Sequence, residues 1–279
     1  MMSLSLWLAQ NFPALFGWLG YGFMRNAFLA ILIISPLFGM LGTMAVDNRM
    51  AFFSDALGHS ALTGVAIGVL LGAKNQMIPM LLFGLAWAAL ITFVKHHSRM
   101  SADTIISVFS SASIALGLVI LSRGASFARY SSLLVGDVLA LTPEDLPWLF
   151  AALAVTLLAW IFLFNPLLVT SVNAPLANSR GIPARLTEYA FSALVALAVM
   201  VSIRWIGVLL INSLLILPAA AARNLAKNAR HYVLLSVLFA TLCGAVGLIL
   251  SYYLDTSAGA SVVLLLTAVY FVTLPFRRR

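Results

Sequence analysis

Residues Leu186 to Ala222 read LTEYAFSALVALAVMVSIRWIGVLLINSLLILPAAAA. Two apolar runs, Leu186–Ile203 and Trp205–Ala222, lie on either side of Arg204. Each run approaches the roughly 20 residues that an α-helix needs to cross a bilayer. The stretch therefore predicts either two helices joined by a tight turn, or one spanning helix followed by a re-entrant piece.

Apolar runs of the same kind occupy most of the remaining chain. They are Tyr21–Val46, Phe53–Leu71, Met77–Val94, Thr104–Leu121, Leu146–Leu163, Tyr232–Leu254 and Gly259–Pro275. No connection between them is long enough to form a soluble domain, so residues 1–279 are predicted to be one membrane domain. We expect an all-α bundle of eight or nine spans. Residues 1–20 contain Pro13 and lack a basic start, which favours an interfacial or partly inserted segment over a signal peptide.

The composition supports a membrane protein. Hydrophobic residues make up 63% of the 279 residues, charged residues only 9%, and the mean hydropathy is +1.07. Soluble domains carry about 25% charged residues. The net charge of +8 is therefore expected to face lipid headgroups rather than nucleic acid. The single cysteine, Cys243, allows no disulfide within the chain, and no Ser/His/Asp or paired-carboxylate arrangement indicates an enzyme.

The basic residues divide unevenly between the two sets of loops when nine crossings are counted. One set holds eleven: Arg49, Lys95, Arg99, Arg180, Arg185, Arg223, Lys227, Arg230, Arg277, Arg278 and Arg279. The other holds five: Arg25, Lys74, Arg123, Arg129 and Arg204. Because short loops rich in Lys and Arg stay in the cytoplasm, the first set and the C-terminus are predicted to be cytoplasmic.

One carboxylate and one imidazole lie inside a predicted span, in the sequence FSDALGHS of Phe53–Ser60. Asp55 and His59 are four residues apart, which places them on one helix face, one turn apart. His59 lies ten residues beyond Arg49, or about 15 Å along a helix, near the middle of the bilayer. This pair fits a divalent transition metal, but it equally fits an Asp–His hydrogen bond that ties two helices together.

Two further polar residues, Asn212 and Ser213, interrupt an apolar run. Hydrogen bonds between helices are the default explanation for such residues, and lining a transport pathway is the alternative. Near a predicted span boundary, Glu188 is expected to pair with Arg185 of the same helix.

The predicted cytoplasmic connection between Asn165 and Arg185 contains Pro175, Gly181 and Pro183. A short helix is predicted at Ala174–Ser179, ended by Gly181, since glycine commonly terminates helices.

Several blocks of sequence follow one another in an order that is typical of one family. They are Asp55–Ser60 (DALGHS), Asp103-Thr104 with Ala115–Leu118, Gly136–Leu139 with Pro143–Leu146, Ala177–Pro183 (ANSRGIP), Gly207–Leu210, Leu215–Ala220 (LILPAA), and Ser251–Asp255 with Gly259-Ala260. By these blocks the chain resembles, from about Gly39 to Leu274, the membrane permease subunits of ABC transporters that import zinc, manganese or ferrous iron. Two positions differ: Gly58 stands where the family usually has serine, and Thr256–Ala258 replaces a common L-P-S.

The resemblance implies a type II ABC importer permease fold in a bacterial cytoplasmic (inner) membrane. It implies a homodimer, two cytoplasmic ATPase subunits that bind ATP, and an extracytoplasmic metal-binding protein. The permease would be non-catalytic and would bind no cofactor besides the transported metal, passing it to the cytoplasm by alternating access. Asp55 and His59 would belong to the metal site. A short cytoplasmic coupling helix, with docking residues Ala177, Arg180, Gly181, Ile182 and Pro183, would contact the ATPase.

Two alternative functions are compatible with parts of the pattern. An importer of a metal chelate such as a siderophore or cobalamin shares the architecture, although an Asp–His pair suits a bare ion better. An ion-coupled secondary transporter would use Asp55 as its coupling group, but the predicted coupling helix argues against it. Imidazole favours zinc and carboxylate favours manganese, so the residues do not select one metal.

Overall fold

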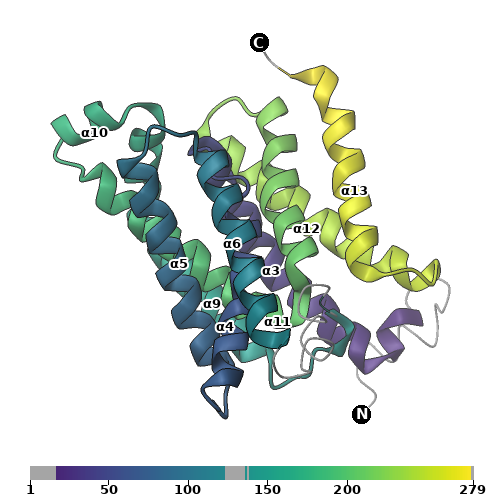
Figure 1. The fold of residues 1–279 in the computed structure, drawn as a ribbon. Coiled ribbons are helices and arrows are strands. Elements are labelled where there is room, and N and C mark those ends of the chain that lie inside the picture. The colour runs from purple at the N-terminus through teal and green to yellow at the C-terminus, as the bar shows by residue number, and fades with distance from the viewer. Residues whose placement is uncertain (1–16, 123–135, 137, 278–279) are drawn as a thin grey trace.

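The structure is a computed structural model, and it describes residues 17–122, 136 and 138–277 (Figure 1). Residues 1–16 of the predicted interfacial segment lie outside the described part. Within it the secondary structure is entirely helical, so the predicted all-α class is confirmed. The helices are α3 (Gly22–Asp47), α4 (Phe53–Leu70), α5 (Met77–His97), α6 (Ala102–Ser122), α9 (Leu146–Val172), α10 (Ala174–Ser179), α11 (Ala184–Leu225), α12 (Ala229–Tyr253) and α13 (Ala258–Thr273), with short 3-10 turns at Gly17–Gly20, Val138–Ala140 and Leu274–Phe276.

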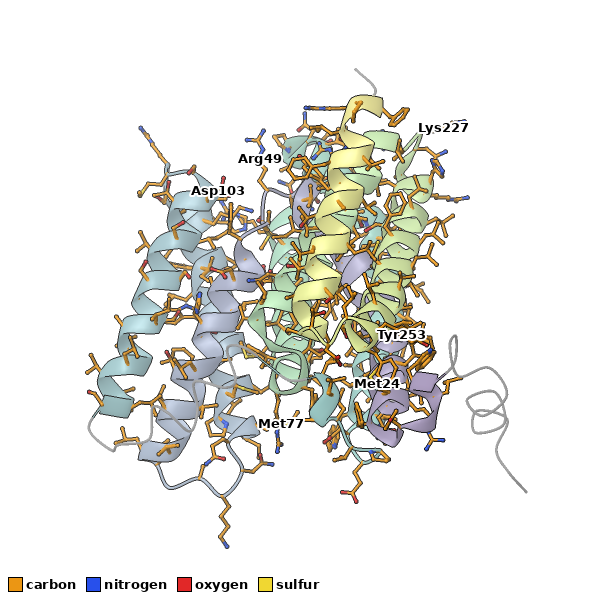
Figure 2. All side chains as sticks on the ribbon, turned by 90° about the vertical axis from the view of Figure 1, so that its right-hand side faces the viewer. Met24, Arg49, Met77, Asp103, Lys227 and Tyr253 are labelled. Atoms are coloured by element: carbon orange, nitrogen blue, oxygen red, sulfur yellow. The ribbon has the colours of Figure 1, made fainter. Side chains whose placement is uncertain are left out.

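Eight of the described helices, all of those above except α10, are long and apolar enough to cross a membrane. The bundle has two ends, which Figure 2 marks with labelled residues: Arg49, Asp103 and Lys227 lie toward one, and Met24, Met77 and Tyr253 toward the other. We call them the Arg49 end and the Met77 end. The short helix α10 lies at the Arg49 end (Figure 1).

Helix α11 consists of two helical arms that meet at Gly207, whose φ of 78° and ψ of 164° are not helical, and the chain reverses direction there. In its first arm, Ser192 forms a 2.8 Å hydrogen bond with Thr92, near the Arg49 end of α5. Late in its second arm, Arg223 lies 3.6 Å from Asp47, the last residue of α3 at the same end. Both arms therefore start or finish at the Arg49 end, and the part of the chain that the structure describes makes nine passages through the bundle. Of the two sequence-based alternatives, two helices joined by a tight turn is correct.

Three helices form the interior of the bundle. In the most apolar 18-residue segment of each helix, 78% of the residues are buried in α3 and α11 and 72% in α4, but only 17% in α9 and α13. The outer helices instead expose large apolar side chains such as Ile161 and Phe162, as expected for surfaces that face lipid. Polar side chains on the three inner helices therefore lie in the most enclosed part of the molecule.

Glycines bring the inner helices close together. A Cβ atom on Gly42 of α3 would lie 1.8 Å from the carbonyl oxygen of Leu215 in α11, and one on Gly64 of α4 would lie 2.6 Å from the Cα of Met80 in α5. Only glycine allows such backbone approach, a common device in membrane helix packing. These contacts hold α3 against α11 and α4 against α5.

Candidate metal site in the membrane interior

The predicted Asp–His pair lies on one face of α4. His59 Nε2 is 3.5 Å from Asp55 Oδ2, as the spacing of four residues predicts. The Asp55 side chain is 40% exposed and that of His59 24% exposed at the surface of the single chain. The pair is thus accessible from outside the helix bundle of one subunit.

The depth of this pair follows from its partner on α11. Asn212 Nδ2 donates a 2.8 Å hydrogen bond to Asp55 Oδ1. Asn212 precedes Arg223, near the Arg49 end, by eleven residues of one helix, or about 16 Å at 1.5 Å per residue. That is about half of the 30 Å thickness of a hydrocarbon core. Asp55, in the first turn of α4, therefore lies about half of this thickness from the Arg49 end of α11.

A third helix reaches the same carboxylate. Ser110 Oγ of α6 donates to Asp55 Oδ2 at 3.4 Å, so α4, α6 and α11 meet at Asp55. Ser110 was not among the residues predicted from the sequence. A run of hydroxyl residues within one predicted span could have indicated it: Ser107, Ser110, Ser111 and Ser113.

Two atoms beside Asp55 have unused bonding capacity. Among the described residues, His59 Nδ1 and Asn212 Oδ1 are buried and have no hydrogen-bond partner. Together with the Asp55 oxygens they offer one carboxylate, one imidazole and one amide oxygen, which are ligand types for manganese and zinc. No group of three His, Cys, Asp or Glu side chains that could hold a metal occurs in the described part of the chain. A full coordination shell would therefore need Asn212, water or another chain.

The two polar residues predicted on α11 have different roles. Ser213 Oγ donates to the carbonyl of Leu209 at 2.8 Å, within its own helix. Asn212 is the one of the two that bonds Asp55.

Glycine at position 58 has a structural reason. A Cβ atom there would lie 2.6 Å from Val208 Cγ1, just after the Gly207 turn. The missing side chain lets the second arm of α11 pack directly on α4, one residue before His59.

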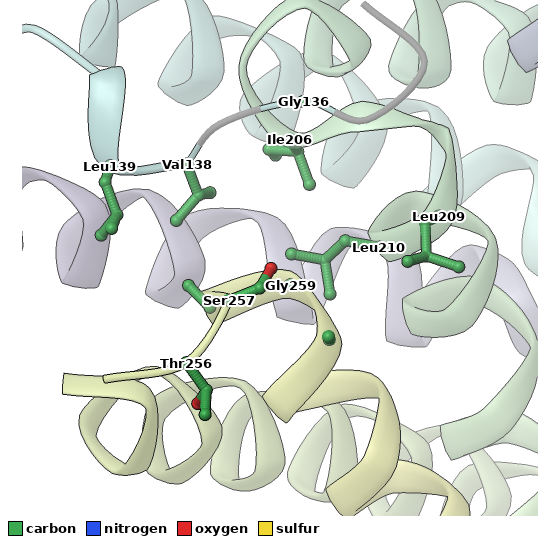
Figure 3. A pocket seen from close by; sticks show the side chains of 11 residues that line it. Gly136, Val138, Leu139, Ile206, Leu209, Leu210, Thr256, Ser257 and Gly259 are labelled. Atoms are coloured by element: carbon green, nitrogen blue, oxygen red, sulfur yellow. The ribbon is translucent and has the colours of Figure 1, made fainter. Parts of the chain in front are cut away.

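A cavity of about 260 Å³ lies at the Met77 end (Figure 3). It lies between the Gly207 turn, the connection between α12 and α13, and the residues Gly136, Val138 and Leu139; the lining also includes Ile206, Leu210, Thr256 and Ser257. The unusual sequence Thr256–Ala258 is thus part of its wall. At one edge Gly136 crosses the turn so closely that a Cβ atom on it would lie 2.2 Å from Gly207 N.

The predicted short helix is present as α10, with the predicted limits Ala174–Ser179. Asn173 Oδ1 accepts from Leu176 N at 3.1 Å to cap its start, and Gly181, at φ 77°, follows its end. Ala177 is buried, whereas Arg180, Gly181 and Pro183 are exposed and Ile182 is half-buried. Ala177 therefore anchors the segment, and its neighbours form the outward surface.

The prediction for Glu188 is wrong. Instead of Arg185, it contacts Lys95 Nζ through Oε1, and its Oε2 lies 3.0 Å from His96 Nε2. The first arm of α11 packs along α5, so partners from the neighbouring helix reach Glu188, which is only 12% exposed. Lys95 also donates to the carbonyl of Asn48, in the turn between α3 and α4, at 3.4 Å.

The sequence model of the ABC 3 transport family matches residues 20–277. The chain belongs to this family. The manganese import system permease protein ScaB of Streptococcus parasanguinis is 32% identical over 90% of this chain and 89% of that protein. The high-affinity zinc uptake system membrane protein ZnuB of Haemophilus influenzae is 33% identical over 90% of this chain and 96% of its own.

A solved structure of PsaBC from Streptococcus pneumoniae in complex with Fab gives the same fold. It matches with a TM-score of 0.79 and 28% identity, over 98% of this chain and 95% of the other. The resemblance to ABC transporter permeases is therefore confirmed in sequence and in fold. This ABC 3 family member is a multi-pass membrane permease subunit, which rules out the ion-coupled secondary transporter.

Proposed function

We propose that this permease imports a bare divalent transition metal ion, manganese or zinc with ferrous iron as the remaining candidate, and that Asp55 and His59 hold the ion midway across the membrane. The observation that carries the proposal is the Asp55 carboxylate at mid-membrane, bonded by Asn212, with unpartnered nitrogen and oxygen atoms beside it. An ionisable group costs several kcal/mol at this depth and needs a functional reason. The names of the manganese and zinc permeases that the chain resembles support the same ions.

The space next to Asp55 favours a bare ion over a chelate. A cavity of about 220 Å³ adjoins the carboxylate. Pockets for organic ligands usually measure about 300–1,000 Å³, and siderophores and cobalamin are larger than most such ligands. A dehydrated or partly hydrated cation fits this space.

A second copy of the chain is the expected partner at this surface. Asp55 is 40% exposed at mid-membrane, where contact with lipid tails would be costly. In a homodimer a second subunit would cover this face and could supply ligands that one chain lacks. The incomplete set of ligands on one chain supports this arrangement.

The Arg49 end would face the cytoplasm of a bacterial cell, because it carries most of the basic residues. There the exposed surface of Arg180, Gly181 and Pro183, with Ile182 beside it and Ala177 as the buried anchor, would dock on a separate ATPase subunit that binds ATP. An extracytoplasmic metal-binding protein would deliver the ion at the Met77 end. Movement of the docked segment would open the Asp55 site to alternate ends, the usual alternating-access scheme.

Each residue at the site has a defined task in this scheme. The Asp55 carboxylate would offset the charge of the ion, and His59 would add a nitrogen ligand that excludes harder cations such as magnesium. Asn212 would orient Asp55 by its hydrogen bond and offer its oxygen to the ion. The chain itself would perform no chemistry.

The test is uptake of radioactive manganese and zinc by the transporter assembled with its ATPase in liposomes. Asp55→Ala and His59→Ala are expected to abolish uptake while the complex still assembles. Glu144→Ala, which changes an exposed acid at the Met77 end, is the matched control and should transport normally. Normal uptake by both site variants would refute the assignment.

A further inference from the structure

Helix α6 has a polar face that ends near the level of Asp55. Starting at the Arg49 end it carries hydroxyl and carboxyl side chains at helical spacing: Asp103, Thr104, Ser107, Ser110 and Ser111, which we call the α6 polar face. All are exposed except Ser110, which is half-buried. Further along the same face, toward the Met77 end, the residues are Ile114 and Leu118. A face that only touched lipid would be apolar along its whole length.

A cavity connects this face to the candidate metal site. The space of about 220 Å³ beside Asp55 is lined by Phe52, Ile106, Ser107, Ser110 and Ser111. Ser107 lies about one helical turn closer to the Arg49 end than Ser110, the serine that bonds Asp55. The space therefore extends from the Asp55 carboxylate toward the Arg49 end.

The hydroxyl groups in this space are available to a ligand. Serines in membrane helices usually donate to a carbonyl one turn back, as Ser113 does to Ser110 and Ser122 to Val119. Among the described residues, the hydroxyls of Ser107 and Ser111 have no hydrogen-bond partner, and neither residue is buried. Such hydroxyls can bond water or take the place of water around a cation.

We infer that the α6 polar face lines the inner half of the ion path, through which a hydrated divalent cation leaves Asp55 for the Arg49 end. The inference rests on the proposed function, because the path starts at Asp55. Neutral hydroxyls bind a divalent ion more weakly than a carboxylate does, so they let it pass without trapping it. Asp103, exposed at the Arg49 end, supplies negative charge that draws the cation from Asp55 toward that end.

Cysteine labelling tests the path without reference to the ion. In the assembled transporter with Cys243→Ala, single changes Ser107→Cys and Ser111→Cys are treated with a charged, membrane-impermeant methanethiosulfonate. Two controls separate the alternatives: Val108→Cys on the next face, 58% exposed, and Leu118→Cys on the same face beyond Asp55, 40% exposed. Thiols ionise and react in water but not in lipid, so the two serine positions should react at least tenfold faster than both controls. Equal rates at Ser107 and Leu118 would overturn the proposal.

A transport measurement distinguishes failure of the path from failure of the metal site. The double change Ser107→Leu with Ser111→Leu should reduce manganese or zinc uptake at least tenfold while metal binding to the transporter is retained. Asp55→Ala should lose both binding and uptake. Normal uptake by the double variant refutes the path and leaves the metal site at Asp55 in place. Normal uptake by Asp55→Ala refutes the metal site, and the cysteine labelling then decides by itself whether the α6 polar face lies in water.

Discussion

Two acid–histidine pairs occur among the described residues, and their surroundings differ. Asp55 and His59 lie at mid-membrane on α4, and Glu188 and His96 join α11 to α5 at the Arg49 end. Glu188 is also paired with Lys95, and its side chain is 12% exposed. Asp55 is 40% exposed, and besides His59 it is bonded by the neutral groups of Asn212 and Ser110.

The difference teaches how to distinguish a structural pair from a candidate metal site. The Glu188 cluster contains its own cation, the Lys95 ammonium, which also bonds the Asn48 carbonyl and so fixes α5 to the turn before α4. The Asp55 cluster has no Lys or Arg among the ion-pair partners recorded in the described part of the chain. Both clusters pair a carboxylate with an imidazole, at 3.5 Å in the Asp55 cluster and 3.0 Å in the Glu188 cluster. The built-in cation separates them.

Giving the Asp55 cluster a cation of its own should produce the largest effect. Asn212→Lys would place an ammonium beside Asp55, as Lys95 lies beside Glu188. Because this charge would repel an incoming metal ion, we expect uptake to fall more than 100-fold, measured with radioactive manganese or zinc in liposomes. Asn212→Gln keeps the amide and should retain most activity; equal loss in both variants would show that the charge is not the cause.

Removing the built-in cation from the other cluster should affect stability more than ion binding. Lys95→Met leaves Glu188 with His96 alone, and breaking a buried ion pair costs about 3–5 kcal/mol, less here because both side chains are partly exposed. We expect a clearly lower Tm in detergent. Adding Glu188→Gln to Lys95→Met should raise the Tm again, because no unpaired acid remains. A double variant as unstable as the single one would contradict the role of the pair.

The hydrogen bond from Asn212 to Asp55 should have an intermediate effect. Asn212→Leu removes a bond to a charged group, worth about 1.5–3 kcal/mol. Uptake should fall at least tenfold, with a higher KM for the ion. Ser213→Ala changes the neighbouring residue, which bonds only within α11, and uptake should not change. A similar loss of uptake in both variants would show that the hydrogen bond from Asn212 to Asp55 is not the cause.

The smallest effect is expected at Gly58. Gly58→Ser adds a small side chain whose Cβ would lie 2.6 Å from Val208 Cγ1. Overpacking of this kind costs about 1–3 kcal/mol, so the Tm should fall modestly. Val208→Ala in the same protein should recover the loss. If the serine variant is as stable as the parent, the packing explanation for Gly58 is wrong.

Local features were predictable from the sequence, since they depend on neighbouring residues. Bilayer thickness fixes the length of apolar runs, the spacing of four places Asp55 and His59 on one face, and Gly181 ends the helix at Ala174–Ser179. The tight turn was expected near Arg204 but occurs at Gly207, because the positive φ of 78° suits glycine.

Contacts between distant segments were not predictable in the same way. Asn212 and Ser110 meet Asp55 across 157 and 55 residues of sequence, and nothing local distinguishes Asn212 from Ser213. The same limit explains the error at Glu188, where a partner three residues away was expected and the packing of α5 against α11 supplied Lys95 instead.

The reversal at Gly207 also constrains how the protein is made. The two arms of α11 are joined by a single non-helical residue, so no free loop separates them during synthesis. They must enter the bilayer together as a helical hairpin. Arg204, exposed three residues before the turn, has to be carried through the hydrocarbon with them, at a cost of about 2.5–3.5 kcal/mol on insertion scales. The apolar length of both arms offsets this cost, which makes the hairpin one unit of membrane insertion.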